Sequence, residues 1–143
     1  MKDTRWILVA DSVQARIYDF VDGELTLQET LERPQSREHS RDLMGNRPNK
    51  NQHPMEKDLK GDESQSLRDD ESRVFAREVC QVLSKAHATN RFRELVMVAD
   101  PRFLGLLRAH LSRPVAAVVA GTIDKHALQM KDRELTQLIE TRT

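Results

Sequence analysis

Two aspartates occupy positions from which carboxylates could hold a divalent metal ion. Asp11 follows one apolar run at 6–10, and Asp100 follows a second at 94–99. If these runs form neighbouring parallel strands, their carboxyl ends meet at one edge of a sheet, which is where the sites of open α/β proteins form. Clustered carboxylates that bind Mg²⁺ are the basis of metal-assisted phosphoryl chemistry. The two residues are therefore the catalytic candidates of a metal-dependent nuclease or hydrolase.

A simpler explanation accounts for each aspartate separately. Asp11 is followed by serine, and this dipeptide is a favourable opening for a turn. Asp100 is followed by proline, which is the expected order of a helix N-cap and the first helical position. A third metal ligand would have to come from a distant part of the chain, such as Glu71 or Glu78. We therefore expect no metal here, and the sequence favours a binding protein over an enzyme.

The other residues that carry chemistry form no catalytic or cofactor pattern. The five histidines lack the spacing that would place two ligands on one helix face. The single cysteine, Cys80, falls in an apolar stretch, so we expect it to be packed rather than nucleophilic. No glycine-rich phosphate loop is present. We therefore expect no cofactor.

A polar stretch from Glu32 to Glu71 has a basic first half and an acidic second half. Between residues 33 and 50 five basic residues accompany two acidic ones, and between 51 and 72 three basic residues accompany seven acidic ones. One interpretation is a solvated loop whose halves attract each other weakly. The other is that the basic half contacts a phosphate backbone or another acidic partner. The candidate binding residues are Arg33, Arg37, Arg41, Arg47 and Lys50, together with Arg102.

Arg102 joins this set because of its place on a predicted helix. The helix begins at Pro101, and a cation in the first turn opposes the helix dipole. Arg102 is thus either part of a solvated face or present for a partner.

Apolar periodicity predicts an alternation of strands and helices. The second and third strands meet at Asp22-Gly23, a dipeptide suited to a tight hairpin turn. In the third strand Leu25, Leu27 and Leu31 are expected on one face. In chain order the predicted elements are strands at 6–10, 14–21 and 24–31, a helix of about twenty residues ending near Asn90, a strand at 94–99, a helix from Pro101, a strand at 115–121 and a last amphipathic helix around 128–139.

This order predicts an α/β domain with a five-stranded mixed sheet and helices on both faces. We expect the strand order 3-2-1-4-5, which is the ribonuclease H-like arrangement, in a single domain spanning residues 1–143. A long, mobile polar loop is expected at 33–65, between the third strand and the first helix. Its few apolar residues cannot offset the entropy lost on ordering.

Composition limits the environment and the class of partner. The 143 residues carry 23 basic and 23 acidic side chains, so no overall field favours nucleic acid or an anionic membrane. No apolar run approaches the length of a membrane span, and no membrane insertion is expected. Charged residues flank the first apolar run, which makes a poor secretory signal. A single cysteine agrees with a reducing compartment, so we expect a cytoplasmic protein.

Four stretches give the chain a resemblance to a known bacterial family. They are WILVADSVQARIYDF at the start, RPQSREHSRDLMGNRP, FAREVCQVL, and LVMVADPRFLGLLRAHL. Together they resemble the host attachment proteins, a family named for attachment to host cells, over essentially the whole chain. That family commonly has a small residue or proline where this chain has Asp100, which argues further against a metal site.

The host attachment family is in turn similar to the middle domain of archaeal and eukaryotic peptide-release factors and of Pelota. This resemblance implies a ribonuclease H-like fold. In the release factors, a loop after the third strand holds a Gly-Gly-Gln tripeptide that acts in peptidyl-tRNA hydrolysis. The corresponding stretch here contains no such tripeptide, and its nearest glycine is Gly45. That activity therefore does not carry over.

Three functions remain open. The first is a non-enzymatic factor associated with RNA or the ribosome, which would use the basic residues of the polar stretch. The second is a protein-interaction factor in surface attachment or stress, whose loop orders on a partner. The third is the metal-dependent nuclease at Asp11 and Asp100. RNA is favoured only slightly over a protein partner, because the loop lacks the aromatic residues that stack on bases.

Overall fold

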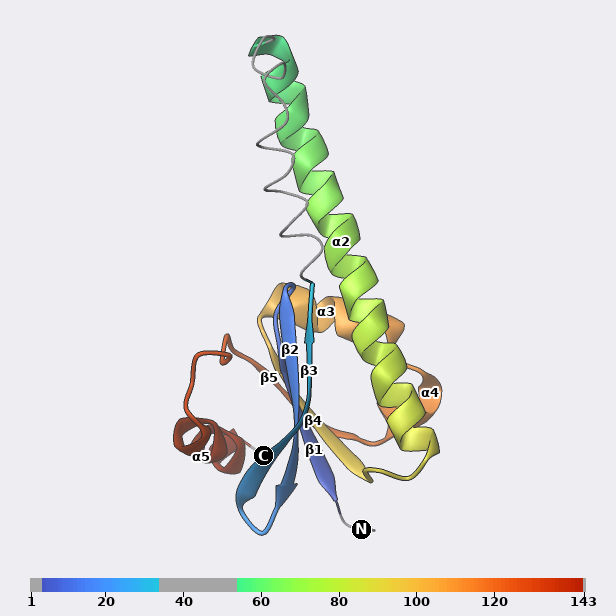
Figure 1. Ribbon diagram of the computed structural model, residues 1–143, viewed down its shortest axis with the longest axis vertical. Coiled ribbons are helices and arrows are strands. Elements are labelled where there is room, and N and C mark those ends of the chain that lie inside the picture. Colours follow the sequence, from blue (N-terminus) through green and yellow to red (C-terminus); the bar gives the residue numbers. More distant parts are fainter. Residues whose placement is uncertain (1–3, 34–53, 143) are drawn as a thin grey trace.

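The computed structural model describes residues 4–33 and 54–142 of the chain. Figure 1 shows a sheet with helices on both sides, and one long helix that packs beside the sheet and extends beyond it. The elements are β1 (Arg5–Ala10), β2 (Gln14–Val21), β3 (Glu24–Glu32), α2 (Pro54–Ala88), β4 (Glu94–Ala99), α3 (Pro101–His110), α4 (Arg113–Ala117), β5 (Val119–Asp124) and α5 (Asp132–Arg142).

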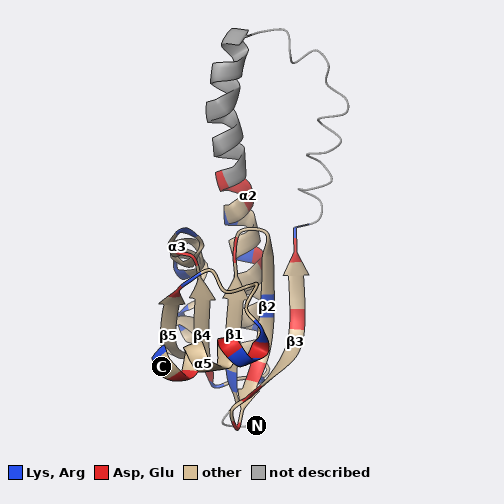
Figure 2. Ribbon diagram, turned by 90° about the vertical axis from the view of Figure 1, so that its left-hand side faces the viewer, with Lys and Arg blue, Asp and Glu red and all other residues tan. Residues whose placement is uncertain are grey.

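The five strands form one sheet in the order β3-β2-β1-β4-β5. β2 pairs antiparallel with both β1 and β3, whereas β4 pairs parallel with both β1 and β5. All strands except β2 therefore point the same way, as the arrows in Figure 2 show. The predicted fold class, a mixed sheet with this strand order and with helices on both faces, is confirmed.

The third strand departs from the face pattern that its sequence predicts. Leu25 packs against the hydrophobic cluster on one face of the sheet, and Leu31 packs against the cluster on the other. A register shift between Ile17 and Tyr18 of β2 is the cause, because a β-bulge changes the phase of the alternation along β3. Leu27 is 52% exposed. The prediction that the three leucines share a face is wrong.

The last strand begins later than predicted. Residues 115–121 were expected to form it, but α4 occupies Arg113–Ala117 and β5 begins at Val119. The hydroxyl of Ser112 accepts a hydrogen bond from the backbone N–H of Val115 at 3.4 Å, and a proline stands in the first turn. Both are helix-start signals, and alanines favour the helix that follows.

Helix α2 is longer than predicted at its start and ends where predicted. It begins at Pro54, so residues 54–65 of the expected polar loop belong to it, whereas residues 34–53 lie outside the described part of the chain. Proline is favoured at the first helical position, and the charged residues that follow are good helix formers. At the other end Asn90 adopts a left-handed φ of 62°, a common way to terminate a helix.

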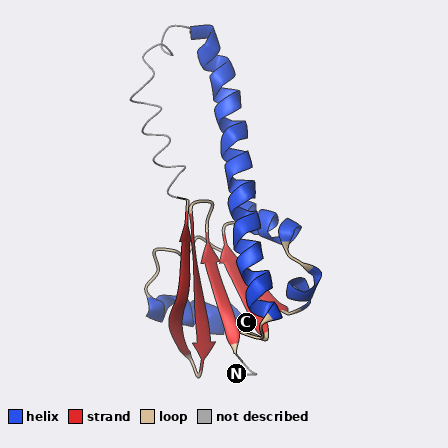
Figure 3. Ribbon diagram, turned by 45° about the vertical axis from the view of Figure 1, so that its right-hand side comes forward, coloured by secondary structure: helices blue, strands red, loops and turns tan. Residues whose placement is uncertain are grey.

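Two hydrophobic clusters cover the two faces of the sheet. Helices α2, α3 and α4 lie on one face and α5 on the other (Figure 3). On the α2 face the fully buried residues include Trp6, Leu8, Phe75, Val79, Leu83, Phe103, Leu107 and Val115. On the α5 face they include Ile7, Val9, Val96, Val98, Leu135 and Ile139.

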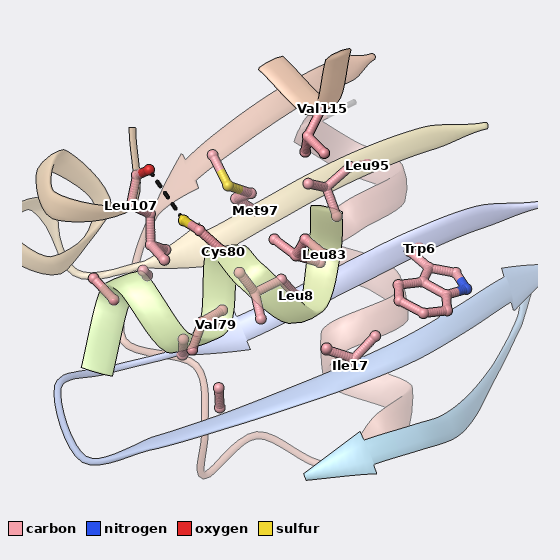
Figure 4. Packing of buried hydrophobic residues seen from close by; sticks show 14 of the residues in the cluster. Trp6, Leu8, Ile17, Val79, Cys80, Leu83, Leu95, Met97, Leu107 and Val115 are labelled. Carbon is pink, nitrogen blue, oxygen red and sulfur yellow. Dashed lines mark hydrogen bonds between the residues drawn. The ribbon is translucent and has the colours of Figure 1, made fainter. Parts of the chain in front are cut away.

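Helices α2 and α3 are joined through the α2-face cluster. The rings of Phe75 and Phe103 have centroids 5.9 Å apart. The thiol of Cys80 donates a hydrogen bond to the carbonyl oxygen of Leu107 at 3.4 Å, as Figure 4 shows. Burial raises the pKa of the Cys80 thiol to about 12, because the thiolate would be poorly solvated. Cys80 is therefore a packed residue, as predicted.

An aromatic cluster closes the amino end of the parallel strands. Trp6 stacks on Phe92 with ring centroids 4.8 Å apart, and the ring of His87 lies 5.4 Å from that of Phe92. The guanidinium carbon of Arg91 lies 5.2 Å from the centre of the indole ring. Trp6 and Phe92 are each 1% exposed. We refer to these four residues as the aromatic cluster.

No helix among the described residues combines the length and the apolar character that crossing a bilayer requires.

Candidate functional site

A cleft of about 320 Å³ opens at the carboxyl end of the parallel strands. It lies where the β1–β2 turn, the end of β3, the side of α2 and the start of α3 come together. Figure 2 shows basic and acidic residues at this end of the sheet. The lining residues are Ser12, Arg33, Asp69, Ser72, Arg73, Asp100, Arg102, Phe103 and Leu106, and we call this site the cleft.

Sheet topology brings these residues together. Ala10 and Ala99 are partners in the register of β1 and β4, so the residues that follow these strands emerge side by side. β3 points the same way as β1, which places Arg33 at the same edge. Helix α2 packs against α3. It therefore also contributes side chains to the lining of the cleft.

Asp11 is occupied as a turn residue. Its Oδ1 accepts hydrogen bonds from the backbone N–H groups of Val13 at 2.8 Å and Gln14 at 2.9 Å. Its own N–H donates to the carbonyl oxygen of Gln14 at 2.9 Å. The carboxylate therefore holds the β1–β2 turn in place, and it is the next residue, Ser12, that lines the cleft.

Asp100 is occupied as the N-cap of α3. Its Oδ2 accepts a hydrogen bond from the N–H of Phe103 at 3.3 Å, and its carbonyl oxygen accepts from the N–H of Leu104 at 2.9 Å. Among the residues that the structure describes, no three His, Cys, Asp or Glu side chains are grouped as metal ligands. Glu78 is exposed on α2, and Glu71 faces Arg33 instead.

Arg33 is the least satisfied cation of the cleft. Its backbone N–H donates to the carbonyl oxygen of Val13 at 2.9 Å, which fixes the residue beside the β1–β2 turn. Its side chain is only 16% exposed. Nε and Nη1 are buried, and within the described residues neither has a hydrogen-bond partner. Nη1 lies 3.8 Å from Oε1 of Glu71, which gives an ion pair but is too long for a hydrogen bond.

The other two arginines of the cleft are paired at its surface. Nη2 of Arg102 donates to Oδ1 of Asp69 at 2.8 Å, and the two side chains are 69% and 40% exposed. Arg73 pairs with Asp70 at 2.6 Å within α2. Arg102 is in an unfavourable position for the helix dipole. Its pair with Asp69 holds its side chain at the cleft.

Three residues singled out from the sequence meet in this cleft, and four are not described. Arg33, Arg102 and Asp100 all line it, although they come from distant parts of the chain. The predicted binding residues Arg37, Arg41, Arg47 and Lys50 lie outside the described residues.

Sequence reasoning missed the contribution of α2. Asp69, Ser72 and Arg73 line the cleft, and they continue at helical spacing the stripe that buries Ala76 and Val79. Extending the apolar stripe of α2 by one turn towards its start would have found them.

One solved structure has a fold similar to this architecture. A solved archaeal translation termination factor, aRF1, aligns with 96% of this chain and 37% of its own length, at 12% identity and a TM-score of 0.52. A second solved structure, described only as an archaeal protein, aligns with 96% of this chain and 36% of its own, at 14% identity and a TM-score of 0.43. The chain thus spans little more than a third of the length of each. At this identity the likeness to the termination factor shows the fold alone.

No curated protein sequence matches the chain. The model of one protein family does, and it covers residues 6–139. This match includes all five strands except Arg5 at the start of β1, and residues 132–139 of α5. The chain therefore belongs to the family described as proteins required for attachment to host cells.

Proposed function

We propose that this protein is a non-enzymatic binding factor of the cytoplasm that associates with RNA, free or within the ribosome. Its contacts are the basic residues Arg33, Arg37, Arg41, Arg47, Lys50 and Arg102. The observation that carries the proposal is the meeting of Arg33 and Arg102 in one cleft, at the edge of the sheet where the basic stretch begins. A phosphate backbone that reached this edge would encounter both.

The likeness to a translation termination factor supports the ribosome as the place where this RNA is met. The shared region is 96% of this chain but 37% of that protein. The chain contains no Gly-Gly-Gln, so the proposal is one of association and not of peptidyl-tRNA hydrolysis.

A protein partner is the second candidate, and a feature of β3 favours it. β3 is an edge strand of the sheet, and Leu27 on it and Val21 at the end of β2 are 52% and 47% exposed. Exposed edges of this kind can accept an added strand from another chain. A factor acting in surface attachment or stress would use this edge.

The test is recovery of the tagged protein from cells, with and without nuclease treatment. Ribosomal RNA and proteins should accompany the untreated sample and be lost on nuclease treatment. Partners that survive the nuclease would instead support the protein-interaction function.

Purified protein should then bind RNA with an affinity that falls as salt rises, because neutralised phosphates release counterions. Replacing Arg37, Arg41 and Arg47 together with Ala should lower the salt slope by about two, given roughly 0.7 per contact with single strands. A matched control replaces Arg77, Arg93 and Arg133, which are exposed elsewhere on the domain and give the same change of charge. Equal loss in both triple variants would contradict a specific role for the basic stretch.

A further inference from the structure

We propose that the cleft is a binding site for a phosphate group, with Arg33 as its anchor. The inference deepens the proposed function, on which its biological meaning rests, because Arg33 and Arg102 belong to both. It concerns one pocket of the folded domain, however, and can stand or fall separately from binding by the basic stretch.

The first argument is the state of the Arg33 side chain. A buried guanidinium whose donors lack hydrogen-bond partners is costly, since these donors have lost their contacts with water and gained no acceptor in exchange. Nε and Nη1 of Arg33 are two such donors within the described residues. The Nε–H of a guanidinium lies beside one N–H of Nη2, and this edge can donate two parallel hydrogen bonds to one phosphate or carboxylate. An anion in the cleft would satisfy Nε in this way, whereas Nη1 lies 3.8 Å from Oε1 of Glu71.

The second argument is the charge around that anchor. The first turn of α3 lines the cleft, and the positive end of a ten-residue helix favours anions. Arg73 and Arg102 line the same cleft, and they pair with Asp70 and Asp69. Three arginines, each with a carboxylate beside it, and the first turn of α3 thus border one space.

The two carboxylates of the lining are already engaged. Asp100 caps α3, and Asp69 pairs with Arg102 at 2.8 Å. Neither is a free negative charge aimed at an incoming anion. Ser12 and Ser72 add hydroxyl groups, which donate readily to phosphate oxygens.

Size limits the ligand. A volume of about 320 Å³ is at the lower end for small-molecule sites. The cleft therefore suits a single phosphorylated nucleotide and is too small for a longer stretch of RNA. The ligand class is therefore a phosphomonoester, which is either a free mononucleotide or the phosphorylated end of an RNA.

The experiment is calorimetric titration of the full chain with inorganic phosphate and with adenosine 5′-monophosphate, using adenosine as the uncharged control. The two phosphates should bind and raise the melting temperature, and adenosine should do neither. Arg33→Gln should weaken binding at least about tenfold, because a bidentate charged contact is lost. Arg102→Gln, at an exposed position, should weaken it by about twofold to fivefold. Arg93→Gln, an exposed arginine away from the cleft, should leave affinity unchanged.

Absence of binding by both phosphates to the unaltered protein would overturn the proposal, as would full affinity in both cleft variants. If Arg33→Gln does not fold, Arg102→Gln decides alone. The source of the phosphate is distinguished with one RNA oligonucleotide carrying either a 5′-phosphate or a 5′-hydroxyl. Tighter binding of the phosphorylated form identifies an RNA end, and equal binding identifies a free mononucleotide.

The two proposals fail in different ways. The triple variant that replaces Arg37, Arg41 and Arg47 with Ala should bind adenosine 5′-monophosphate with unchanged affinity. Its affinity for RNA should be lower. Phosphate binding without any RNA binding in the unaltered protein would refute the proposed function and leave the phosphate site intact. RNA binding without phosphate binding would refute the phosphate site and leave the proposed function intact.

Discussion

At the amino end of the parallel strands Arg91 lies over the ring of Trp6, whereas at the carboxyl end Arg33 is buried beside a cleft with two nitrogens unpaired among the described residues. Both arginines stand next to the sheet. Arg33 forms an ion pair with Glu71, but two of its buried nitrogens have no hydrogen-bond partner among the described residues. A cation over an indole face is stabilised by the ring quadrupole without any further partner. The buried donors of Arg33 require one.

This difference indicates that the amino end of the parallel strands stabilises the fold and that the carboxyl end binds a ligand. Trp6 and Phe92 of the aromatic cluster are each 1% exposed and contribute to the free energy of folding. The cleft is lined by charged residues whose pairs are partly exposed and contribute little to it. Substitutions at the amino end should therefore change stability without changing ligand affinity. Substitutions of the cleft arginines should change ligand affinity with only a small change in stability.

The largest effect is expected from Phe92→Ala. Phe92 is 1% exposed and stacks on Trp6, so its truncation leaves a cavity and should lower the free energy of unfolding by about 3–5 kcal/mol. Urea unfolding followed by the fluorescence of Trp6, the single tryptophan, measures this directly. Affinity for adenosine 5′-monophosphate should be unchanged below the transition. A loss under about 1 kcal/mol would mean that the aromatic cluster is not the stable end.

A smaller effect on the free energy of unfolding is expected at alkaline pH. It arises from Cys80, which lies in the core between the aromatic cluster and the cleft. The pKa of its thiol is raised from 9.0 to about 12, so only the unfolded chain ionises in this window. The stability that the neutral thiol provides is complete below pH 9.0 and is lost as the pH rises towards 12. The loss should amount to about 1.4 kcal/mol per pH unit.

The measurement compares the unaltered protein with Cys80→Ala by urea unfolding at about pH 8 and about pH 10. Other groups titrate equally in both proteins, so their contributions cancel in the difference. The stability advantage of the unaltered protein should shrink by about 1.4 kcal/mol between the two conditions. A constant difference would show that Cys80 ionises as readily in the folded state as in the unfolded chain.

The smallest effect on stability is expected at the cleft itself, from Asp100→Ala. Loss of the N-cap acceptor of α3 should lower the free energy of unfolding by about 1 kcal/mol. Asp100→Asn keeps an acceptor at the same position and should retain most of that stability. If Asp100→Asn were as unstable as Asp100→Ala, the carboxylate would have a role that depends on its charge.

The fold could be predicted because its strongest signals are local. Apolar runs, the Asp22-Gly23 turn and the Asp-Pro helix start define most elements, and the short connections between them leave few topologies. The bulge between β2 and β3 could not be predicted, since it depends on how two strands pair and not on either sequence alone. The early start of α2 was missed because a polar sequence without an apolar stripe was interpreted as a loop.

The site could be predicted in part. Arg33 and Arg102 were identified by their charge and position, but nothing in either local sequence indicates that they line the same cleft. That depends on α2 packing against α3, which also adds Asp69 and Ser72. The remaining basic candidates, from Arg37 to Lys50, stay predictions because they lie outside the described residues.

The parallel pairing of β1 with β4 has a consequence for synthesis of the chain. Arg5 pairs with Glu94, a partner 89 residues later. A ribosome that adds about 5–20 residues per second needs roughly 4–18 s to cover that distance. Throughout this interval β1 can pair with β2 but has an open edge on its other side, with Ile7, Leu8 and Val9 uncovered by the later helices. The nascent chain is therefore most vulnerable to aggregation before β4 emerges, because the open edge of this central strand can pair with another chain.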